Sequence, residues 1–353
     1  MGYYVEPGQY YESAEAKRRM RNLVDACGLL ELLVTDVRDG GVVRRAATRQ
    51  ELEAVHAPAY VERVAAASGK GGGDAGDCAF YGPGSFAIAA LAAGCAIGAV
   101  DAVAEGRVDN AYVLCRPPGH HATREMGMGF CVFNSVAVAA KHARTRLRMG
   151  RVAVVDYDVH HGNGTEEAFY GDPGVLVVSV HEDSLYPLGT GKVEDRGEGA
   201  GEGYNVNVPL PPGSGVGAYT EAFDRIVHPL LDAFEPEIIL VSSGFDASAL
   251  DPLGHMMLPS GWFGEAAARL AARGVGVVFV HEGGYSEVAA PFCGLRVLEA
   301  MAGVPKSNVV DVMEGEIRAY GYQETQAHQR AVIDRVEREI EEVKGLMRSR
   351  AAA

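Results

Sequence analysis

Two adjacent histidines, His120 and His121, stand in a turn rich in proline and glycine, RPPGHH, directly after the apolar run 111–115. Neither a helical nor a strand period easily buries both imidazoles there. Because histidine titrates near neutral pH, such a pair suits general acid–base catalysis. We predict His121 as the base, with His120 as its electrostatic partner or a proton donor. Asp156 is placed to orient His120 by a hydrogen bond, and Asn163 to hold His121.

A second group of titratable residues follows the apolar run 152–156, in the stretch DYDVHHGNG. At a strand end, residues i and i+2 point the same way, so Asp158 and His160 can converge on one point. Asp246, at the end of another apolar run, is placed to supply a third ligand. Two carboxylates and an imidazole with an open position are typical of a catalytic metal site, because structural zinc sites fill all four positions. Zinc suits this set, and iron(II) also fits.

Tyr285 ends the sequence EGGY, which follows the apolar run 275–280. The two glycines before it let the backbone approach the site closely. Its hydroxyl can then donate a hydrogen bond to the oxyanion of a tetrahedral intermediate. Each of these residues alone would be read as structural. Together they indicate an active site in which a water activated by a metal attacks a carbonyl.

The elements that must position these residues are short and uniformly apolar, as strands covered on both faces are. The expected strands are residues 111–115, 152–156, 175–180, 238–241 and 275–280. Helical stretches alternate with them at 86–105, 134–148, 219–234 and 261–273. This alternation predicts an α/β fold with a mainly parallel central sheet and helices on both faces. Ligands bind beyond the carboxyl ends of such strands, where these groups fall.

Composition limits the class of protein. A chain of 353 residues with 48% hydrophobic and 22% charged residues can bury a sizeable core. We expect one domain over residues 1–353, with a core from about 5 to 301 and a C-terminal helical extension over 306–353. The net charge of −15 argues against a nucleic-acid partner. Because there is no N-terminal apolar segment and no run of roughly eighteen uncharged apolar residues, we expect a cytoplasmic protein without a membrane partner.

The blocks RPPGHH, DYDVHHGNGT, GFDASALDPLG and EGGY, in this order and spacing, resemble the signature blocks of the histone deacetylase and acetylpolyamine amidohydrolase superfamily. The resemblance runs from about Val5 to about Met301. It implies an arginase-like α/β fold and zinc-dependent hydrolysis of an N-acetyl amide. Tyr285 is similar to the active members, and Asn163 to the class II branch. The implied ligands of the one zinc ion are Asp158, His160 and Asp246.

The resemblance also implies a potassium ion near the zinc and a tunnel for the acyl chain. The potassium positions are Asp156, Asp158, His160, Ser179 and Val180. The positions that match the tunnel, its rim and its mouth are Asp77, Gly129, Phe130, Leu253 and Gly283. Tyr186 and Leu188 are both candidates for the second wall, because residues 185–191 align in more than one register. The chain has Tyr10 or Tyr11 where many relatives have a histidine, so its entrance loop departs from theirs.

The substrate is the least determined feature. Leu253 follows Asp-Pro where polyamine-specific relatives have a glutamate, and it offers no contact to an ammonium group. We therefore expect acetyl-lysine in proteins or peptides, with an acetylated polyamine or another small acetylated amine as the alternative and a catalytically dead ligand-binding protein as a third. Gly162, two residues beyond His160, argues against a binuclear manganese ureohydrolase, which needs a carboxylate there. We expect a dimer or tetramer, with contact surfaces around residues 69–84 or after Pro305.

Overall fold

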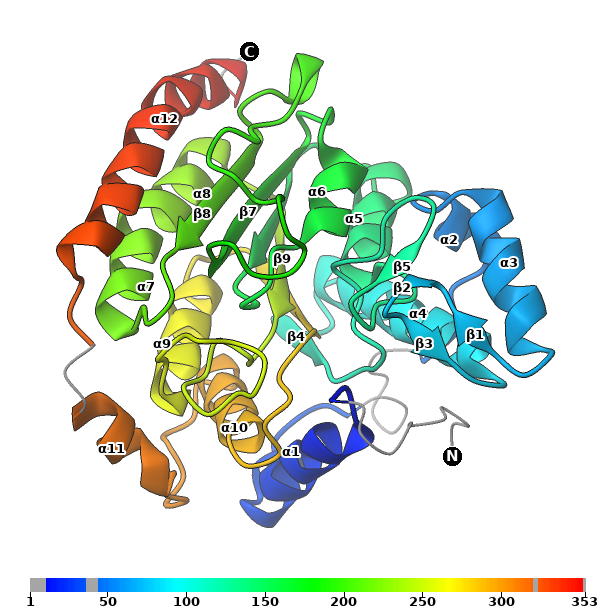
Figure 1. Cartoon of the computed structure of the whole chain (residues 1–353), viewed down its shortest axis with the longest axis horizontal. Helices are drawn as coiled ribbons and strands as arrows, with labels where there is room; N and C mark the ends of the chain where they lie inside the picture. Colours follow the sequence, from blue (N-terminus) through cyan, green and yellow to red (C-terminus); the bar gives the residue numbers. More distant parts are fainter. Residues whose placement is uncertain (1–10, 36–43, 320–322, 352–353) are drawn as a thin grey trace.

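A six-stranded sheet lies at the centre of the computed structural model, in which residues 11–35, 44–319 and 323–351 are described. The strand order is β4-β10-β9-β6-β7-β8, and all neighbouring strands are parallel (Figure 1). The strands are β4 Asn110–Val113, β6 Val152–Asp156, β7 Val175–Glu182, β8 Asn205–Leu210, β9 Ile238–Ser243 and β10 Gly276–His281. The predicted α/β class is confirmed, and the five apolar runs correspond to β4, β6, β7, β9 and β10.

Of the six strands of the central sheet, the edge strand β8 is the one that sequence analysis missed. Asn205 and Asn207 interrupt its apolar residues, so β8 lacks the uniform apolar run of the other strands. The side-chain amides of both asparagines donate to one carboxylate oxygen of Glu166, at 2.6 and 2.7 Å. Buried hydrogen bonds therefore replace apolar contacts along one side of this strand.

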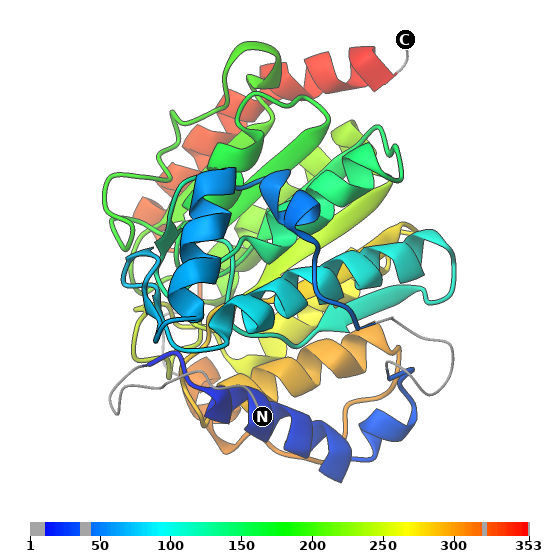
Figure 2. The ribbon, with the colours of Figure 1, turned by 90° about the vertical axis from the view of Figure 1, so that its right-hand side faces the viewer.

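Helices cover both faces of the sheet, because successive strand residues point to opposite sides. Val155 and Val178 pack in one apolar cluster with α1 Ala14–Ala26, α7 Val216–Ala222, α8 His228–Phe234, α9 Ser260–Ala271, α10 Ala290–Met301 and α12 Ala327–Ala351. Val154 and Val177 pack in the other with α2 Arg49–Glu53, α3 Pro58–Ser68, α4 Ser85–Ala104 and α5 Ser135–Thr145. Figure 2 shows α3, α4 and α5 in front of the strands. The predicted helices correspond to α4, α5, α7 with α8, and α9.

Short strands form two small sheets at the side of the molecule that carries α2 and α3 (Figure 1). They are β1 Gly73–Asp74, β2 Gly76–Asp77, β3 Phe80–Tyr81 and β5 Gly127–Met128. β1 pairs with β3 in the antiparallel sense, and β2 pairs with β5 in parallel. The second pair brings residues 76–77 beside residues 127–128, close in sequence to the histidine turn.

α4 is long and apolar enough to meet a composition test for a membrane-spanning helix, which sequence analysis did not anticipate. Its one charged side chain, Asp101, accepts a hydrogen bond from His142 of α5 at 2.7 Å. In the fold, 61% of its most apolar window is buried, and the helix contacts α5, β4 and β10. Packing between the sheet and a neighbouring helix accounts for its apolar composition, because a core helix passes the same test.

Beyond Met301 the chain forms α11 Val312–Ala319 and α12. α12 runs along the outside of α7, α8 and β8 (Figure 1). One side of it is buried, through the apolar side chains Ile333, Val336, Ile340, Val343 and Met347. Its polar side forms ion pairs, such as those from Asp334 and Glu337 to Arg225 of the π-helical segment between α7 and α8. α12 therefore covers the edge strand β8.

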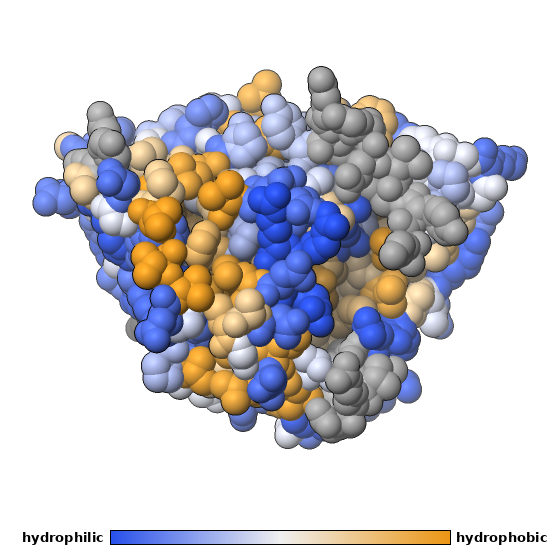
Figure 3. Space-filling view, turned by 90° about the horizontal axis from the view of Figure 1, so that it is seen from below, coloured by the Kyte–Doolittle hydropathy of each residue, from blue (hydrophilic) through white to orange (hydrophobic). Residues whose placement is uncertain are grey.

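Apolar side chains gather on the face of the molecule that carries α10 and α11 (Figure 3). Val310 and Val312, just before and at the start of α11, are 69% and 74% exposed. They belong to the segment after Pro305 that sequence analysis proposed as a subunit contact. Assembly into a dimer or tetramer stays a prediction.

We predict that Ile340→Ala lowers the free energy of unfolding by about 2–5 kcal/mol, because it leaves a cavity beneath α12. Denaturant unfolding measures this loss. Arg338→Ala, at an exposed position two residues earlier, is the matched control and should change stability by less than about 0.5 kcal/mol. Equal effects of the two substitutions would show that α12 does not pack on the sheet as described.

Candidate active site

The predicted site residues come from loops at the carboxyl ends of four adjacent strands, β4, β10, β9 and β6. The loop after β4 carries the histidine pair, and the loop after β6 carries the DYDVHH block. Asp246 follows β9, and Tyr285 follows β10. Because parallel strands end at the same edge of the sheet, residues far apart in sequence meet there.

Nested turns after β6 fix the direction of the candidate metal ligands. The carboxylate of Asp156 accepts a hydrogen bond from the backbone N–H of Asp158 at 3.0 Å. The carboxylate of Asp158 in turn accepts one from the backbone N–H of His160, also at 3.0 Å. Such i to i+2 bonds are the ordinary turn chemistry of aspartate. They hold the three residues of the DxDxH pattern toward one point.

Asp158, His160 and Asp246 form the predicted metal group. One ligand atom from each lies within 4.8 Å of the others, and all three side chains are buried. Nδ1 of His160 lies 3.1 Å from carboxylate oxygens of both aspartates. Burial and the neighbouring Asp158 carboxylate raise the pKa of Asp246 to about 7. A divalent cation would relieve this repulsion, so the donor set fits a metal with nitrogen and oxygen ligands.

The backbone approaches the metal group at Gly283. Its N–H donates to Oδ2 of Asp158 at 2.8 Å. A side chain at this position would overlap the Asp246 carboxylate. The close approach that sequence analysis attributed to the glycines of EGGY therefore occurs at the first of them.

The two histidines have different partners. Nδ1 of His120 lies 2.9 Å from Oδ2 of Asp156, and Nδ1 of His121 lies 2.8 Å from Oδ1 of Asn163. Both side chains are buried, and their ring centroids are 4.0 Å apart. Nε2 of His120 lies 3.7 Å from the carboxylate of Asp158. The imidazole pair therefore lies directly beside the metal group.

These partners set opposite charge states for the two imidazoles. Burial lowers the pKa of His120, but the carboxylates of Asp158 and Asp156 outweigh it and raise that pKa to about 10. Burial, together with the neighbouring His120 and His160, holds the pKa of His121 well below its usual value. At neutral pH one histidine is therefore charged, and the other is neutral and able to accept a proton.

Tyr285 also lies beside the metal group. Its ring centroid is 6.5 Å from that of His160 and 5.5 Å from that of Phe130. Burial and the carboxylates of Asp246 and Asp158 raise the pKa of Tyr285 well above its usual value. The phenol therefore stays protonated and can donate a hydrogen bond.

Tyr186 and Leu188, which sequence analysis left as alternatives, lie in different surroundings. The ring of Tyr186 meets that of His121 edge to face, with centroids 5.2 Å apart, whereas Leu188 is 80% exposed. The Tyr186 hydroxyl donates to the carboxylate of Asp77 at 2.8 Å. At Gly129 a Cβ would lie 2.6 Å from the His121 ring and 2.7 Å from the Tyr186 ring. Only a residue without a side chain fits between them.

The remaining predicted residues are placed around this centre. Phe130 has a φ of 70°, and its N–H donates to the backbone oxygen of Cys78 at 3.0 Å. Ser179 and Val180 are buried in β7, where Ser179 pairs with Asp156 across the sheet. Leu253 is half-buried in the loop after β9. Tyr11 is 54% exposed, and Tyr10 lies outside the described residues.

Sequence analysis assigned no role to Asp251, although it stands in the LDPLG block. Its Oδ2 accepts hydrogen bonds from the N–H groups of Tyr285 and Ser286, at 2.7 and 3.1 Å. Its Oδ1 accepts one from Leu253 at 3.0 Å. Asp251 therefore links the loop that carries Tyr285 to the loop that carries Leu253, the residue expected at the mouth of the tunnel. No sequence signal could have shown this, because the donors are backbone groups.

Glu12 and Glu282 also received no role. Glu12 is fully buried, and its carboxylate pairs with Arg116 of the RPPGHH block at 2.6 Å and with Lys17 at 3.0 Å. These pairs attach the histidine turn to α1. Glu282 directly follows β10, so the strand-end rule that selected Asp246 would have found it.

Comparison with known proteins gives a consistent assignment. Residues 12–301 match the family model of the histone deacetylase domain. The chain is 47% identical over 312 residues to a histone deacetylase-like amidohydrolase of Pseudomonas aeruginosa, covering 86% of this chain and 80% of that protein. It is 41% identical over 271 residues to a probable deacetylase of Archaeoglobus fulgidus, covering 74% of each. A crystal structure of the HDA15 HD domain matches with a TM-score of 0.81 at 29% identity, covering 99% of this chain and 93% of that one.

The fold and the site thus define an amidohydrolase of the deacetylase class with an arginase-like α/β fold. The chain belongs to the histone deacetylase family. The family resemblance and the enzyme class expected from the sequence are confirmed.

We predict that Asp251→Asn lowers kcat about tenfold or more, because the amide presents an NH2 group to backbone N–H donors and releases the Tyr285 loop. In a Tyr285→Phe background the same substitution should cost little, since the hydroxyl that it positions is already gone. Steady-state kinetics of the four proteins measures this coupling. Glu287→Gln, an exposed carboxylate of the same loop, is the control. Full additivity of the two substitutions would contradict the role of Asp251.

Proposed function

We propose that this chain is a zinc-dependent deacetylase that removes the acetyl group from acetyl-lysine in proteins or peptides. One observation carries the proposal: a buried Asp-His-Asp metal group lies beside both a neutral histidine and a protonated tyrosine at one edge of the sheet. An acyl-transfer site needs these three components, namely a Lewis acid, a base and an oxyanion donor.

Asp158, His160 and Asp246 would hold one zinc ion. When bound, zinc would polarise the acetyl carbonyl and lower the pKa of a water molecule. Borderline-soft zinc accepts such a mixed imidazole and carboxylate set. Gly162 supports a single metal, because a second one would need another carboxylate at that position.

The residues around the metal group have different tasks in proton transfer and in stabilising charge. His121 has Nδ1 engaged with Asn163, so Nε2 is free to take a proton from the attacking water. His120 is held in its charged form by the carboxylates of Asp158 and Asp156 and stabilises the negative charge that develops. The Tyr285 hydroxyl donates a hydrogen bond to the oxyanion. His121, once protonated, gives its proton to the leaving amine.

We also propose a structural potassium ion beside the zinc site, at Asp156, Asp158, His160, Ser179 and Val180. The pairing of Asp156 with Ser179 on adjacent strands supports it, because this register brings the two residues side by side. A cation there would also reduce the repulsion between Asp156 and Asp158.

Acetyl-lysine is favoured by the apolar character of the approach to the site. Gly129, Phe130 and Tyr186 offer aromatic and backbone surface, which suits the neutral methylene stem of an acylated lysine. Leu253 gives no charge-assisted contact to a second ammonium group. Asp77 is near the surface, but its carboxylate already accepts a hydrogen bond from Tyr186.

We predict that His121→Ala and Tyr285→Phe each lower kcat about a hundredfold or more while zinc stays bound, because each removes one proton-transfer or oxyanion group. Asp158→Ala should lose the metal itself. Elemental analysis and turnover of a fluorogenic acetyl-lysine peptide measure both effects. His328→Ala, at an exposed position on α12, is the control. Near-normal turnover of His121→Ala would mean that the base is another residue, and two equivalents of manganese would contradict the single zinc site.

We predict that wild-type kcat/KM is higher for an acetyl-lysine peptide than for N-acetylputrescine or N8-acetylspermidine. Leu253→Glu should shift this ratio toward the polyamines by about tenfold or more, the effect of one charge-assisted hydrogen bond. Leu253→Gln has the same length without the charge and is the matched control. A wild-type preference of about tenfold for a polyamine would overturn the substrate assignment. Equal ratios for the two variants would show that selectivity is set elsewhere.

A further inference from the structure

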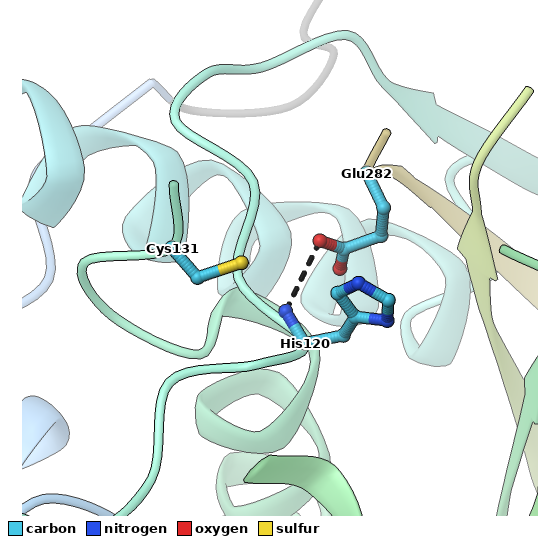
Figure 4. Close-up of side chains that lie close together, drawn as sticks. All are labelled: His120, Cys131 and Glu282. Atoms are coloured by element: carbon cyan, nitrogen blue, oxygen red, sulfur yellow. Dashed lines mark hydrogen bonds between the residues drawn. The ribbon is translucent and has the colours of Figure 1, made fainter. Parts of the chain in front are cut away.

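Glu282 is a fully buried carboxylate to which the proposed chemistry gives no task. It directly follows β10, and its Oε2 accepts hydrogen bonds from the backbone N–H groups of Gly119 and His120, at 2.6 and 3.1 Å. Figure 4 shows the carboxylate directed toward the backbone nitrogen of His120. The turn that carries both imidazoles is therefore attached to the end of the adjacent strand.

The backbone of His120 is also hydrogen-bonded through its carbonyl group. The backbone oxygen of His120 accepts hydrogen bonds from the N–H groups of Gly164 and Thr165, at 3.0 and 3.1 Å. These groups lie at the start of α6, Asn163–Phe169. The histidine turn is not part of a helix or strand, so its position depends on these contacts from the loops after β10 and β6.

The side chains of His120, Cys131 and Glu282 also have the spacing of metal ligands, within 4.8 Å of one another. Their hydrogen bonds argue against a metal there. Oε2 of Glu282 already serves two N–H donors, and the Cys131 thiol donates to the backbone oxygen of Gly129 at 3.5 Å. Burial and the Glu282 carboxylate hold the pKa of Cys131 well above its usual value, so its sulfur stays a thiol.

We propose that Glu282 is a positioning residue, which fixes the backbone at Gly119 and His120 so that both imidazoles face the metal group. The position of the backbone depends on one acceptor oxygen, Oε2, at hydrogen-bond distance from both N–H groups, and not on the negative charge of the side chain. Oε1 has no hydrogen-bond partner among the described residues. This inference rests on the proposed roles of His120 and His121, because the carboxylate acts only through them.

Two conservative substitutions of Glu282 separate the effect of its side-chain length from the effect of its charge. Glu282→Gln keeps an oxygen that can accept from both N–H groups and places its amide where Oε1 has no partner. Glu282→Asp keeps the charge but withdraws the carboxylate by one methylene. We expect the Gln variant to keep kcat within about threefold and the Asp variant to lose about tenfold or more, with KM changed less than about twofold in both. The opposite order would show that the charge matters and would overturn the proposal.

A double-mutant comparison tests whether Glu282 acts through the histidines. In a His121→Ala background, Glu282→Asp should cost little further, because the imidazole that it positions is absent. A full additional loss would indicate a general structural role and contradict the proposal. Glu125, an exposed carboxylate in the segment just after the histidine pair, supplies the matched controls Glu125→Gln and Glu125→Asp.

Two readouts do not depend on turnover. Histidine side-chain NMR of the zinc-loaded protein should show a shifted His121 resonance in Glu282→Asp and an unchanged one in Glu282→Gln. Elemental analysis should give the same metal content in both variants and the wild type; loss of one metal equivalent in Glu282→Gln would instead reveal a second metal site and overturn the proposal. An inactive wild-type enzyme would refute the proposed function alone, since the NMR comparison still decides the role of Glu282.

Discussion

The active-site edge of the sheet depends on burying several carboxylates close together. These carboxylates are those of Asp156, Asp158, Asp246 and Glu282. Each side chain is at most 1% exposed, so water cannot compensate its charge. Buried charges are costly unless hydrogen bonds or counter-charges replace their hydration. Backbone N–H groups, imidazoles and the proposed cations take over this task. This need for hydrogen-bond donors constrains the positions of the loops, because each loop must bring a donor to a carboxylate on another loop.

Crowding around these carboxylates explains why glycine recurs in the motif blocks. At Gly244 a side chain would overlap the Asp158 carboxylate, and at Gly283 it would overlap that of Asp246. The backbone forms a wall of the site at both positions, and at Gly283 it also donates a hydrogen bond to Asp158. A residue with a side chain would push the carboxylates apart, and with them the point at which the metal group converges.

The histidine pair shows how adjacent residues of one type acquire different chemistry. His120 faces a carboxylate, and its pKa is raised, whereas His121 faces the neutral amide of Asn163, and its pKa is lowered. Placing titratable groups in environments that separate their pKa values is how a site holds an acid and a base at one pH. The asymmetry arises because the carboxylates of Asp158 and Asp156 outweigh burial at His120, whereas burial and the neighbouring imidazoles dominate at His121.

The sequence alone determined the features that rest on local spacing. Uniform apolar runs marked five of the six strands, and the i to i+2 pattern of Asp158 and His160 marked two metal ligands, because strand geometry fixes where such side chains point. Only the tertiary structure could add the contacts between distant segments. It set Tyr186 rather than Leu188 against His121. It also placed the carboxylates of Asp251 and Glu282 on backbone groups. Backbone donors are the same in every residue except proline, so no sequence pattern can show which of them a carboxylate will meet.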